Sequence, residues 1–254
     1  MHAISPGEVG DAWRSLGQRL PRPDVVLIAS AHWETALPML TGSARPETIH
    51  DFGGFPPALY DILYPAAGKP DLAAKAVGLL KDAGITAGVD GCRGLDHGAW
   101  VPLRWMYPDA HIPVVQISVS PARGTAHHVA LGRALAPLRE AGVLIIGSGH
   151  ATHNLRDWML GHGPGGRSPV EPLPYAAAFA HWLEARLAAH DEAALIDYRD
   201  QAPDAQRAHP TEEHYLPLLV AYGAAGPAPD VERVVDGYEN GALSRDSFLF
   251  GAAA

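Results

Sequence analysis

Cysteine is almost absent from this chain: Cys92 is the single one among 254 residues. One thiol forms no intramolecular disulfide and supplies no cysteine-rich zinc site. Chains without disulfides are typical of reducing compartments, so we expect a cytoplasmic location. A metal site here would be built from nitrogen and oxygen ligands.

Basic residues are also scarce. Lys and Arg total 19 against 28 Asp and Glu, the formal net charge is −9, and Lys and Arg form no cluster. Because phosphate binding needs such clusters, we do not expect nucleic acid as a partner. Long apolar runs are missing too. The longest, from Val25 to Ala31, is far too short to span a bilayer, so we expect no membrane partner.

The alternation of apolar segments predicts an α/β protein: a single domain over residues 1–254 with a mainly parallel central sheet flanked by helices. Short β-branched runs predict buried strands, and longer segments with helical spacing predict helices between them. Such alternation favours a parallel sheet covered on both faces. The expected strands are 24–30, 112–118, 143–147 and two short ones within 232–250. The expected helices are 71–83, 125–140, 175–189, 192–199 and 212–221. Pro and Gly predict a shaped loop over 45–70 and a lid over 161–172.

Histidine is abundant, with 14 residues, and four of them lie at expected strand ends or helix starts: His32, His97, His153 and His214. α/β proteins place their chemistry at the carboxyl ends of strands. Imidazole is the commonest metal ligand and titrates near neutral pH. The pattern therefore predicts a histidine-rich metal site.

Each of these histidines has a plainer interpretation. His32 could be a core residue bonded to backbone, and His214 a surface residue of its helix. The Asp-His-Gly sequence around His97 is more often an ordinary turn, although the neighbouring carboxylate could raise the basicity of the ring.

Two further positions stay open between a functional and a plain role. His150 competes with His153 for the same role, and we prefer His153 because Asn154 beside it could orient a substrate or a ring. His50, in the shaped loop, could bind substrate or simply be exposed to solvent. The spacing contains no short metal motif, so the residues alone indicate an α/β protein with a histidine-rich metal site.

Seven segments form a specific pattern in a fixed order: Ser30–Glu34, Thr48–Pro56, Leu95–Pro102, Met106–Ala110, Ile112–Gln116, Gly147–Gly149 with Thr152–Leu155, and His209–Leu219. In this order they resemble the DOPA-dioxygenase branch of the class III (LigB-type) extradiol ring-cleavage dioxygenases. The resemblance extends from about Gly10 to Gly251.

The resemblance implies an enzyme that opens a catechol ring with O2 at one non-haem Fe(II) or Zn(II) ion per chain. It places His32 and His214 on metal-ligand positions. It places His153 on the position of an acid/base catalyst or an additional ligand, and His97 near O2 and substrate. The residues implied to lie near the substrate are His50, Asp51 and Phe52. The chemistry suits these residue types, because such a metal needs open positions and one histidine must take and return a phenolic proton.

One departure from the family pattern concerns the start of the chain. The family begins with a strand followed by His-Gly-Ser-Pro, whose His is the first metal ligand. Aligning Pro6-Gly7 and Trp13 with the family puts that ligand before Met1, with His2 as a less favoured replacement. We therefore expect the first strand and the first metal ligand to be missing. We expect the chain to bind Fe(II) weakly or not at all. We also expect lower stability, or dimerisation through an exposed strand edge.

Two other functions stay open. A zinc-dependent hydrolase would use the metal to activate water. A non-catalytic binding relative would have a degraded metal site. For the leading interpretation the expected partner is a small aromatic diol, and the protein is expected to be a monomer or homodimer.

Overall fold

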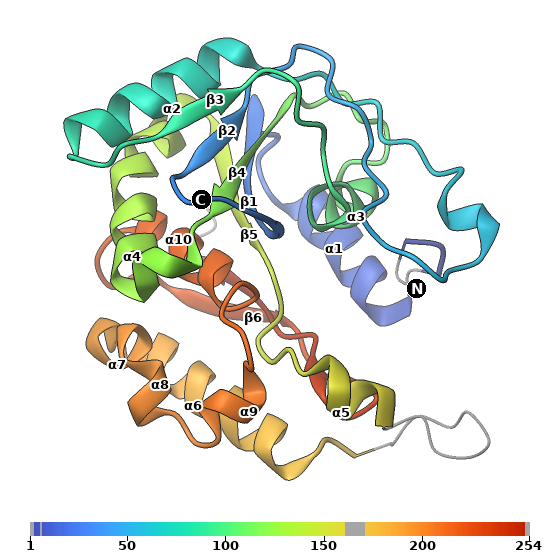
Figure 1. Cartoon of the computed structure of the whole chain (residues 1–254), viewed down its shortest axis with the longest axis vertical. Coiled ribbons are helices and arrows are strands. Elements are labelled where there is room, and N and C mark those ends of the chain that lie inside the picture. Colours follow the sequence, from blue (N-terminus) through green and yellow to red (C-terminus); the bar gives the residue numbers. More distant parts are fainter. Residues whose placement is uncertain (1–2, 6, 161–170, 252–254) are drawn as a thin grey trace.

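The computed structural model describes residues 3–5, 7–160 and 171–251 (Figure 1). His2 and positions 161–170 of the expected lid lie outside the described residues. Within the described ranges, no helix is both long and apolar enough to cross a membrane.

The centre of the molecule is a five-stranded sheet in the order β3-β2-β4-β1-β5. Its strands are β1 (Val25–Glu34), β2 (Met39–Thr41), β3 (Gly88–Asp90), β4 (Val114–Val119) and β5 (Val143–Ser148). β1 pairs in parallel with both β4 and β5, and β2 in parallel with β3. β2 runs antiparallel to β4, since the turn from β1 to β2 is too short for a crossover. The predicted mainly parallel sheet is confirmed.

Helices cover both faces of this sheet (Figure 1). On one side lie α2 (Pro70–Asp82), α4 (Gly124–Leu135) and α10 (Leu216–Ala225), and on the other α1 (Gly7–Arg19) and α3 (His97–Met106). β1 alternates between the two cores: Leu27 and Ala29 pack on the α2 side, and Val26 and Ile28 on the α3 side. A strand buried on both faces explains the continuous apolar run in the sequence.

A second layer of short elements follows β5. It contains α5 (Leu155–Leu160), α6 (Pro174–Ala188), α7 (Glu192–Ile196), α8 (Tyr198–Gln201) and α9 (Ala205–Ala208). β6 (Val231–Val235) pairs with β9 (Ser247–Phe250), and β7 (Tyr238–Glu239) with β8 (Leu243–Ser244). The 3-10 helices are η1 (Pro57–Leu59), η2 (Pro121–Arg123) and η3 (Ala136–Ala141).

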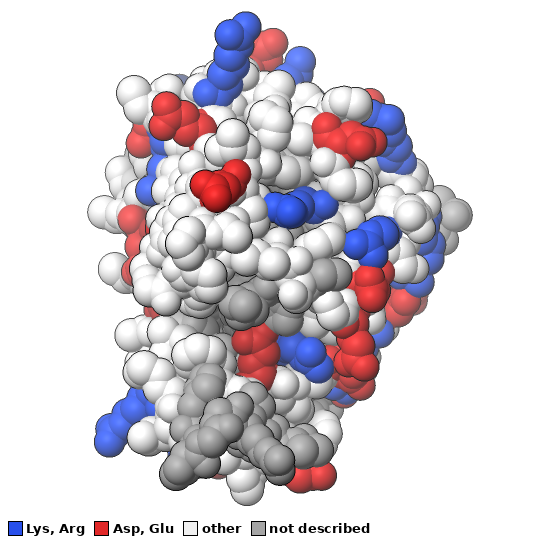
Figure 2. All heavy atoms as spheres, turned by 90° about the vertical axis from the view of Figure 1, so that its right-hand side faces the viewer, with Lys and Arg blue, Asp and Glu red and all other residues white. Residues whose placement is uncertain are grey.

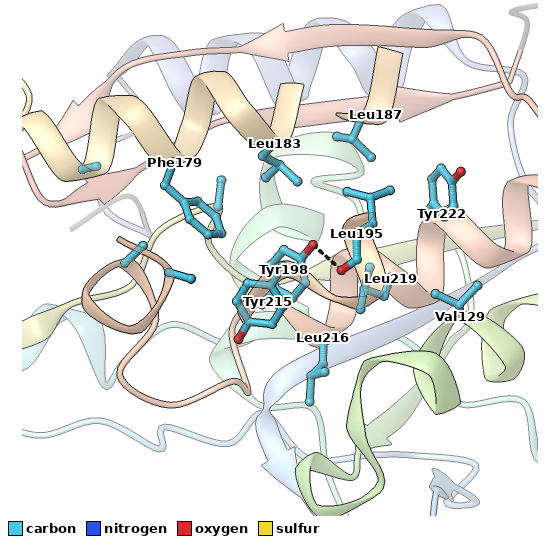
Figure 3. Packing of buried hydrophobic residues seen from close by; sticks show 14 of the residues in the cluster. Val129, Phe179, Leu183, Leu187, Leu195, Tyr198, Tyr215, Leu216, Leu219 and Tyr222 are labelled. Carbon is cyan, nitrogen blue, oxygen red and sulfur yellow. Dashed lines mark hydrogen bonds between the residues drawn. The ribbon is translucent and has the colours of Figure 1, made fainter. Parts of the chain in front are cut away.

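An aromatic core anchors the segment that precedes α10 (Figure 3). The rings of Tyr198 and Tyr215 stack with centroids 4.0 Å apart. The Tyr215 hydroxyl donates a hydrogen bond to the Leu195 carbonyl oxygen at 2.9 Å, and Tyr215 is fully buried. His214 precedes this anchor directly, so its backbone position is fixed by the core.

Three predicted helices differ from those observed. The helix expected over 212–221 begins at Leu216, with Pro217 in its first turn, so His214 lies in a turn and not on a helix. The helix expected over 192–199 is divided at Asp197 into α7 and α8. The helix expected over 125–140 tightens into η3 near Pro137.

Charged side chains are mixed on the face shown in Figure 2, where Lys and Arg lie among Asp and Glu. The surface ion pairs of the described residues include Arg19 with Glu232 at 2.7 Å and Arg233 with Glu184 at 3.0 Å. On this face the basic side chains do not gather into one patch.

Candidate active site

His32 lies near the carboxyl end of β1, between β4 and β5. The sequence predicted a strand that ends at Ser30. β1 instead continues to Glu34, with a register shift against β4 after Ser30. His32 therefore projects from the strand itself. It lies at the edge of the sheet formed by the carboxyl ends of the parallel strands, where α/β proteins bind ligands.

A fully buried carboxylate, Asp96, supports this edge. It caps the N-terminus of α3 by accepting a hydrogen bond from Ala99 N at 3.3 Å. It also accepts one from Ser30 Oγ at 2.7 Å, one from Arg93 at 3.1 Å and one from the Gln116 side-chain amide. The network joins β1, β4 and α3, so it sets how His32 and His97 face each other.

Replacing Asp96 by Ala should destabilise the fold by about 3 kcal/mol, since it leaves the half-buried Arg93 guanidinium and several buried donors without their acceptor. Urea unfolding would measure the loss. Asp109→Ala, at an exposed position, is the matched control and should stay within about 0.5 kcal/mol of the wild type. Equal stability of the two variants would show that the network does not hold this edge.

His97, the first residue of α3, pairs with Asp51 from the shaped loop. Asp51 Oδ1 accepts hydrogen bonds from the His97 backbone N–H at 3.0 Å and from Nδ1 at 2.9 Å. Its Oδ2 lies 3.9 Å from Nδ1 of His32. Because a carboxylate oxygen only accepts, Nδ1 of His97 is the donor, and Nε2 is the ring nitrogen that this pair does not engage. The carboxylate that acts on His97 is thus Asp51, not the adjacent Asp96 that the sequence suggested.

The shaped loop also contributes an aromatic wall. The ring of Phe52 lies edge-on to His97, with centroids 5.5 Å apart, and packs against Tyr60 at 5.3 Å. His50 Nε2 lies 2.9 Å from the Ile62 carbonyl oxygen, so His50 ties the loop together. Its direct contact with a substrate stays a prediction.

A second group of histidines faces the first: His150, His153 and His214. His153 and His214 stack with centroids 3.4 Å apart, and Nδ1 of His150 lies 3.3 Å from Nδ1 of His214. The rings of His214 and His32 are 4.9 Å apart, which connects the two groups. Segments far apart in the sequence thus bring together the four histidines singled out in it.

Burial lowers the pKa of three of these imidazoles, those of His32, His153 and His214. Burial, followed by the charge of His97, lowers the pKa of His32 to about 4. Burial, with the charges of His209 and His32, lowers the pKa of His153 to about 3. Burial and the neighbouring histidines place the pKa of His214 well below its usual value. Burial alone would raise the pKa of Asp51, but the hydrogen bonds and charge of His97 lower it to about 2.

The metal-free protein should therefore lose stability as pH falls. The folded-state pKa values of His32 and His153, about 4 and about 3, lie below the unfolded value of about 6.5. The unfolded chain thus binds more protons below pH ~6.5, and the stability present above that pH declines toward pH 4, by up to about 1.4 kcal/mol per unit for each such histidine. Urea unfolding of chelator-treated protein between about pH 7.5 and pH 4.5 tests this. Stability that rises on acidification would contradict it.

The side chains present fit a transition-metal ion. Ligand atoms of His150, His153 and His214 lie within 4.8 Å of one another, as do those of His32, Asp51 and His97. Neutral imidazoles offer the lone pairs that Fe(II) and Zn(II) accept. Acidic groups lie close by: Glu213 Oε1 is 3.9 Å from His153 Nδ1. Burial, with the charge of Glu213, raises the pKa of Glu34.

Asn154 holds the loop that carries His153. Its Nδ2 donates to the Arg207 carbonyl oxygen at 2.8 Å, and its Oδ1 accepts from the Asp157 N–H at 3.0 Å at the start of α5. These bonds engage both ends of the amide, so a direct contact of Asn154 with substrate stays a prediction.

Sequence reasoning missed the network around Asp96. An Asp before a helical apolar pattern is an N-cap signal and could have revealed it.

Fold and site together define a class: an α/β enzyme whose histidine-lined edge can bind a transition-metal ion. The family described as the catalytic LigB subunit of aromatic ring-opening dioxygenase matches residues 8–246. The chain is 44% identical to a 4,5-DOPA dioxygenase extradiol of Beta vulgaris, over 90% of this chain and 83% of that protein. For the protein of the same name from Escherichia coli K12, the identity is 41%, over 94% and 87%.

A solved structure agrees with these sequences. The crystal structure of an uncharacterized protein from Escherichia coli K12 matches with a TM-score of 0.78 and 37% identity, over 94% of this chain and 91% of that one. The chain belongs to the LigB family and is an aromatic ring-opening dioxygenase. This membership favours the dioxygenase over the hydrolase and over the non-catalytic relative.

Proposed function

We propose that this enzyme cleaves the ring of a DOPA-like catechol beside its diol, with O2, at a non-haem metal ion. The observation that carries the proposal is the meeting of the histidine groups around His32 and His214 at one edge of the sheet, with rings 4.9 Å apart. Relatives named for 4,5-DOPA dioxygenase activity, at 41–44% identity, support the substrate class.

His32 and His214 are the residues we expect to hold the ion, one per chain. Fe(II) is the better candidate than Zn(II), because O2 chemistry needs a redox-active ion with open positions. When bound, Fe(II) would supply that redox chemistry and the positions for the diol oxygens and O2. Asp51 and the aromatic wall of the shaped loop would flank the catechol ring.

Proton transfer is assigned to His153. Its lowered pKa leaves the ring unprotonated at physiological pH, so a ring nitrogen can accept a phenolic proton. Glu213 near its Nδ1 would stabilise the imidazolium that results. His97, held by Asp51, would present Nε2 to the O2 and substrate side.

A catechol panel tests the proposal. Protein loaded anaerobically with Fe(II) is mixed with O2 and L-DOPA, dopamine, catechol or tyrosine. We expect O2 uptake and a yellow ring-opened product with the diols, fastest with L-DOPA, and none with the monophenol tyrosine. Protein loaded with Zn(II) should be inactive. Absence of O2 uptake with every diol would refute the assignment.

A further inference from the structure

We propose that His150 is a metal ligand that the site uses together with His214, so that His153 stays available for the proton. This inference deepens the proposed function and rests on the metal site assigned there. Three observations support it: the distance between two ring nitrogens, the relative tilt of the rings, and the way the backbone holds the two residues together.

The distance between the ring nitrogens matches that between two ligands of one ion. Nδ1 of His150 and Nδ1 of His214 lie 3.3 Å apart, a hydrogen-bond distance at which the two rings share a proton when no ion is bound. With metal–nitrogen bonds of about 2.0–2.1 Å, two ligands of a tetrahedral ion are separated by about 3.3–3.4 Å. An ion between the two nitrogens would accept both lone pairs.

Ring orientation favours His150 over His153 as the second ligand beside His214. The lone pair of an imidazole nitrogen lies in the plane of its ring. The rings of His153 and His214 are stacked, 17° from parallel with centroids 3.4 Å apart, so one ion cannot lie in both planes. The rings of His150 and His214 are tilted by 52°, so their planes intersect, as the planes of two rings that share one ion must.

The backbone fixes His150 against His214. The His150 N–H donates to the His214 carbonyl oxygen at 3.2 Å. A Cβ added at Gly149 would lie 2.2 Å from that same carbonyl oxygen, and one at Gly147 would lie 2.1 Å from the Pro217 oxygen. Only glycine permits this approach, so the loop after β5 is held against the segment that carries His214.

Cobalt spectroscopy tests the assignment without relying on turnover. In a Cys92→Ser background, which removes the one native thiol, His150→Cys places a thiolate where the ligand is expected. Co(II) bound there should show the near-ultraviolet thiolate-to-cobalt charge-transfer band. His181→Cys, on the exposed side of α6, is the matched control and should not show it. Absence of the band in His150→Cys would overturn the proposal.

Affinity gives a second measure. Chelator competition should show Co(II) and Zn(II) bound at least about tenfold more weakly by His150→Ala than by wild type, because even groups that only orient ligands change affinity 10–100-fold. His181→Ala should bind like wild type. Unchanged affinity in His150→Ala, or no binding by wild type, would overturn the proposal. A band and an affinity loss without ring cleavage would instead refute the proposed function alone.

Discussion

Ring cleavage should be lost when His214 is replaced by Ala. His214 is 4% exposed, its ring stacks on that of His153, and its Nδ1 lies 3.3 Å from Nδ1 of His150. Its ring also lies 4.9 Å from that of His32. Without it the ion would lose the ligand that both histidine groups adjoin. We expect kcat/KM to fall by more than about a hundredfold and the bound metal to fall in parallel, since even groups around ligands change affinity 10–100-fold.

Two controls make this result specific. His181→Ala removes an exposed imidazole on α6 and should keep full activity and metal content. Thermal unfolding of metal-free His214→Ala should stay cooperative, because Tyr215 still anchors the segment through its bond to Leu195. An active, metal-replete His214→Ala protein would show that the ion is held elsewhere.

Replacing His153 by Gln should separate chemistry from metal binding. Glutamine keeps the polarity and much of the size of the side chain, but it cannot take and return a proton. General acid–base catalysis contributes about 10²–10⁴-fold, so kcat should fall by that factor. The metal content and the KM for the catechol should change little.

The pH dependence of kcat gives the second readout for His153. Because burial lowers the pKa of His153 to about 3, the limb of wild-type kcat that reports its protonation should lie well below pH ~6.5, and His153→Gln should lack that limb. If the variant loses its metal as His214→Ala does, His153 is a ligand, and the proton belongs to another residue. His181→Gln should reproduce the wild-type profile.

Three strands of the sheet, β1, β4 and β5, could be predicted from the sequence because they are continuous apolar runs rich in β-branched residues. The strands β2 and β3 were not anticipated, since three residues carry too little of a pattern. Helices that contain residues typical of turns were harder to predict. The helix α1 was not anticipated, because it contains Gly17. A Cβ at this position would lie 2.3 Å from the Met106 carbonyl oxygen, so the glycine serves close packing against α3. α3 begins with His97-Gly98 and contains Pro102, which together look like a loop.

The histidines of the site could be named from the sequence, but their partners could not. The pair of Asp51 with His97 joins residues 46 apart, and His150 meets His214 across 64 residues. Such contacts depend on tertiary packing, which local patterns do not encode. The expectation of a monomer or homodimer stays a prediction. Weak Fe(II) binding stays one too, and the cobalt titration tests it with a close analogue of Fe(II).

The most direct test of the central claim is the fate of O2 during one turnover. Fe(II)-loaded protein should consume one O2 per L-DOPA. After reaction with heavy-oxygen-labelled O2, mass spectrometry should find one labelled oxygen in the new carbonyl group and one in the new carboxyl group of the ring-opened product. The label in the carbonyl group is corrected for exchange with water. A product that carries no label from O2, or O2 consumed without ring opening, would contradict the assignment of this site as an extradiol dioxygenase centre.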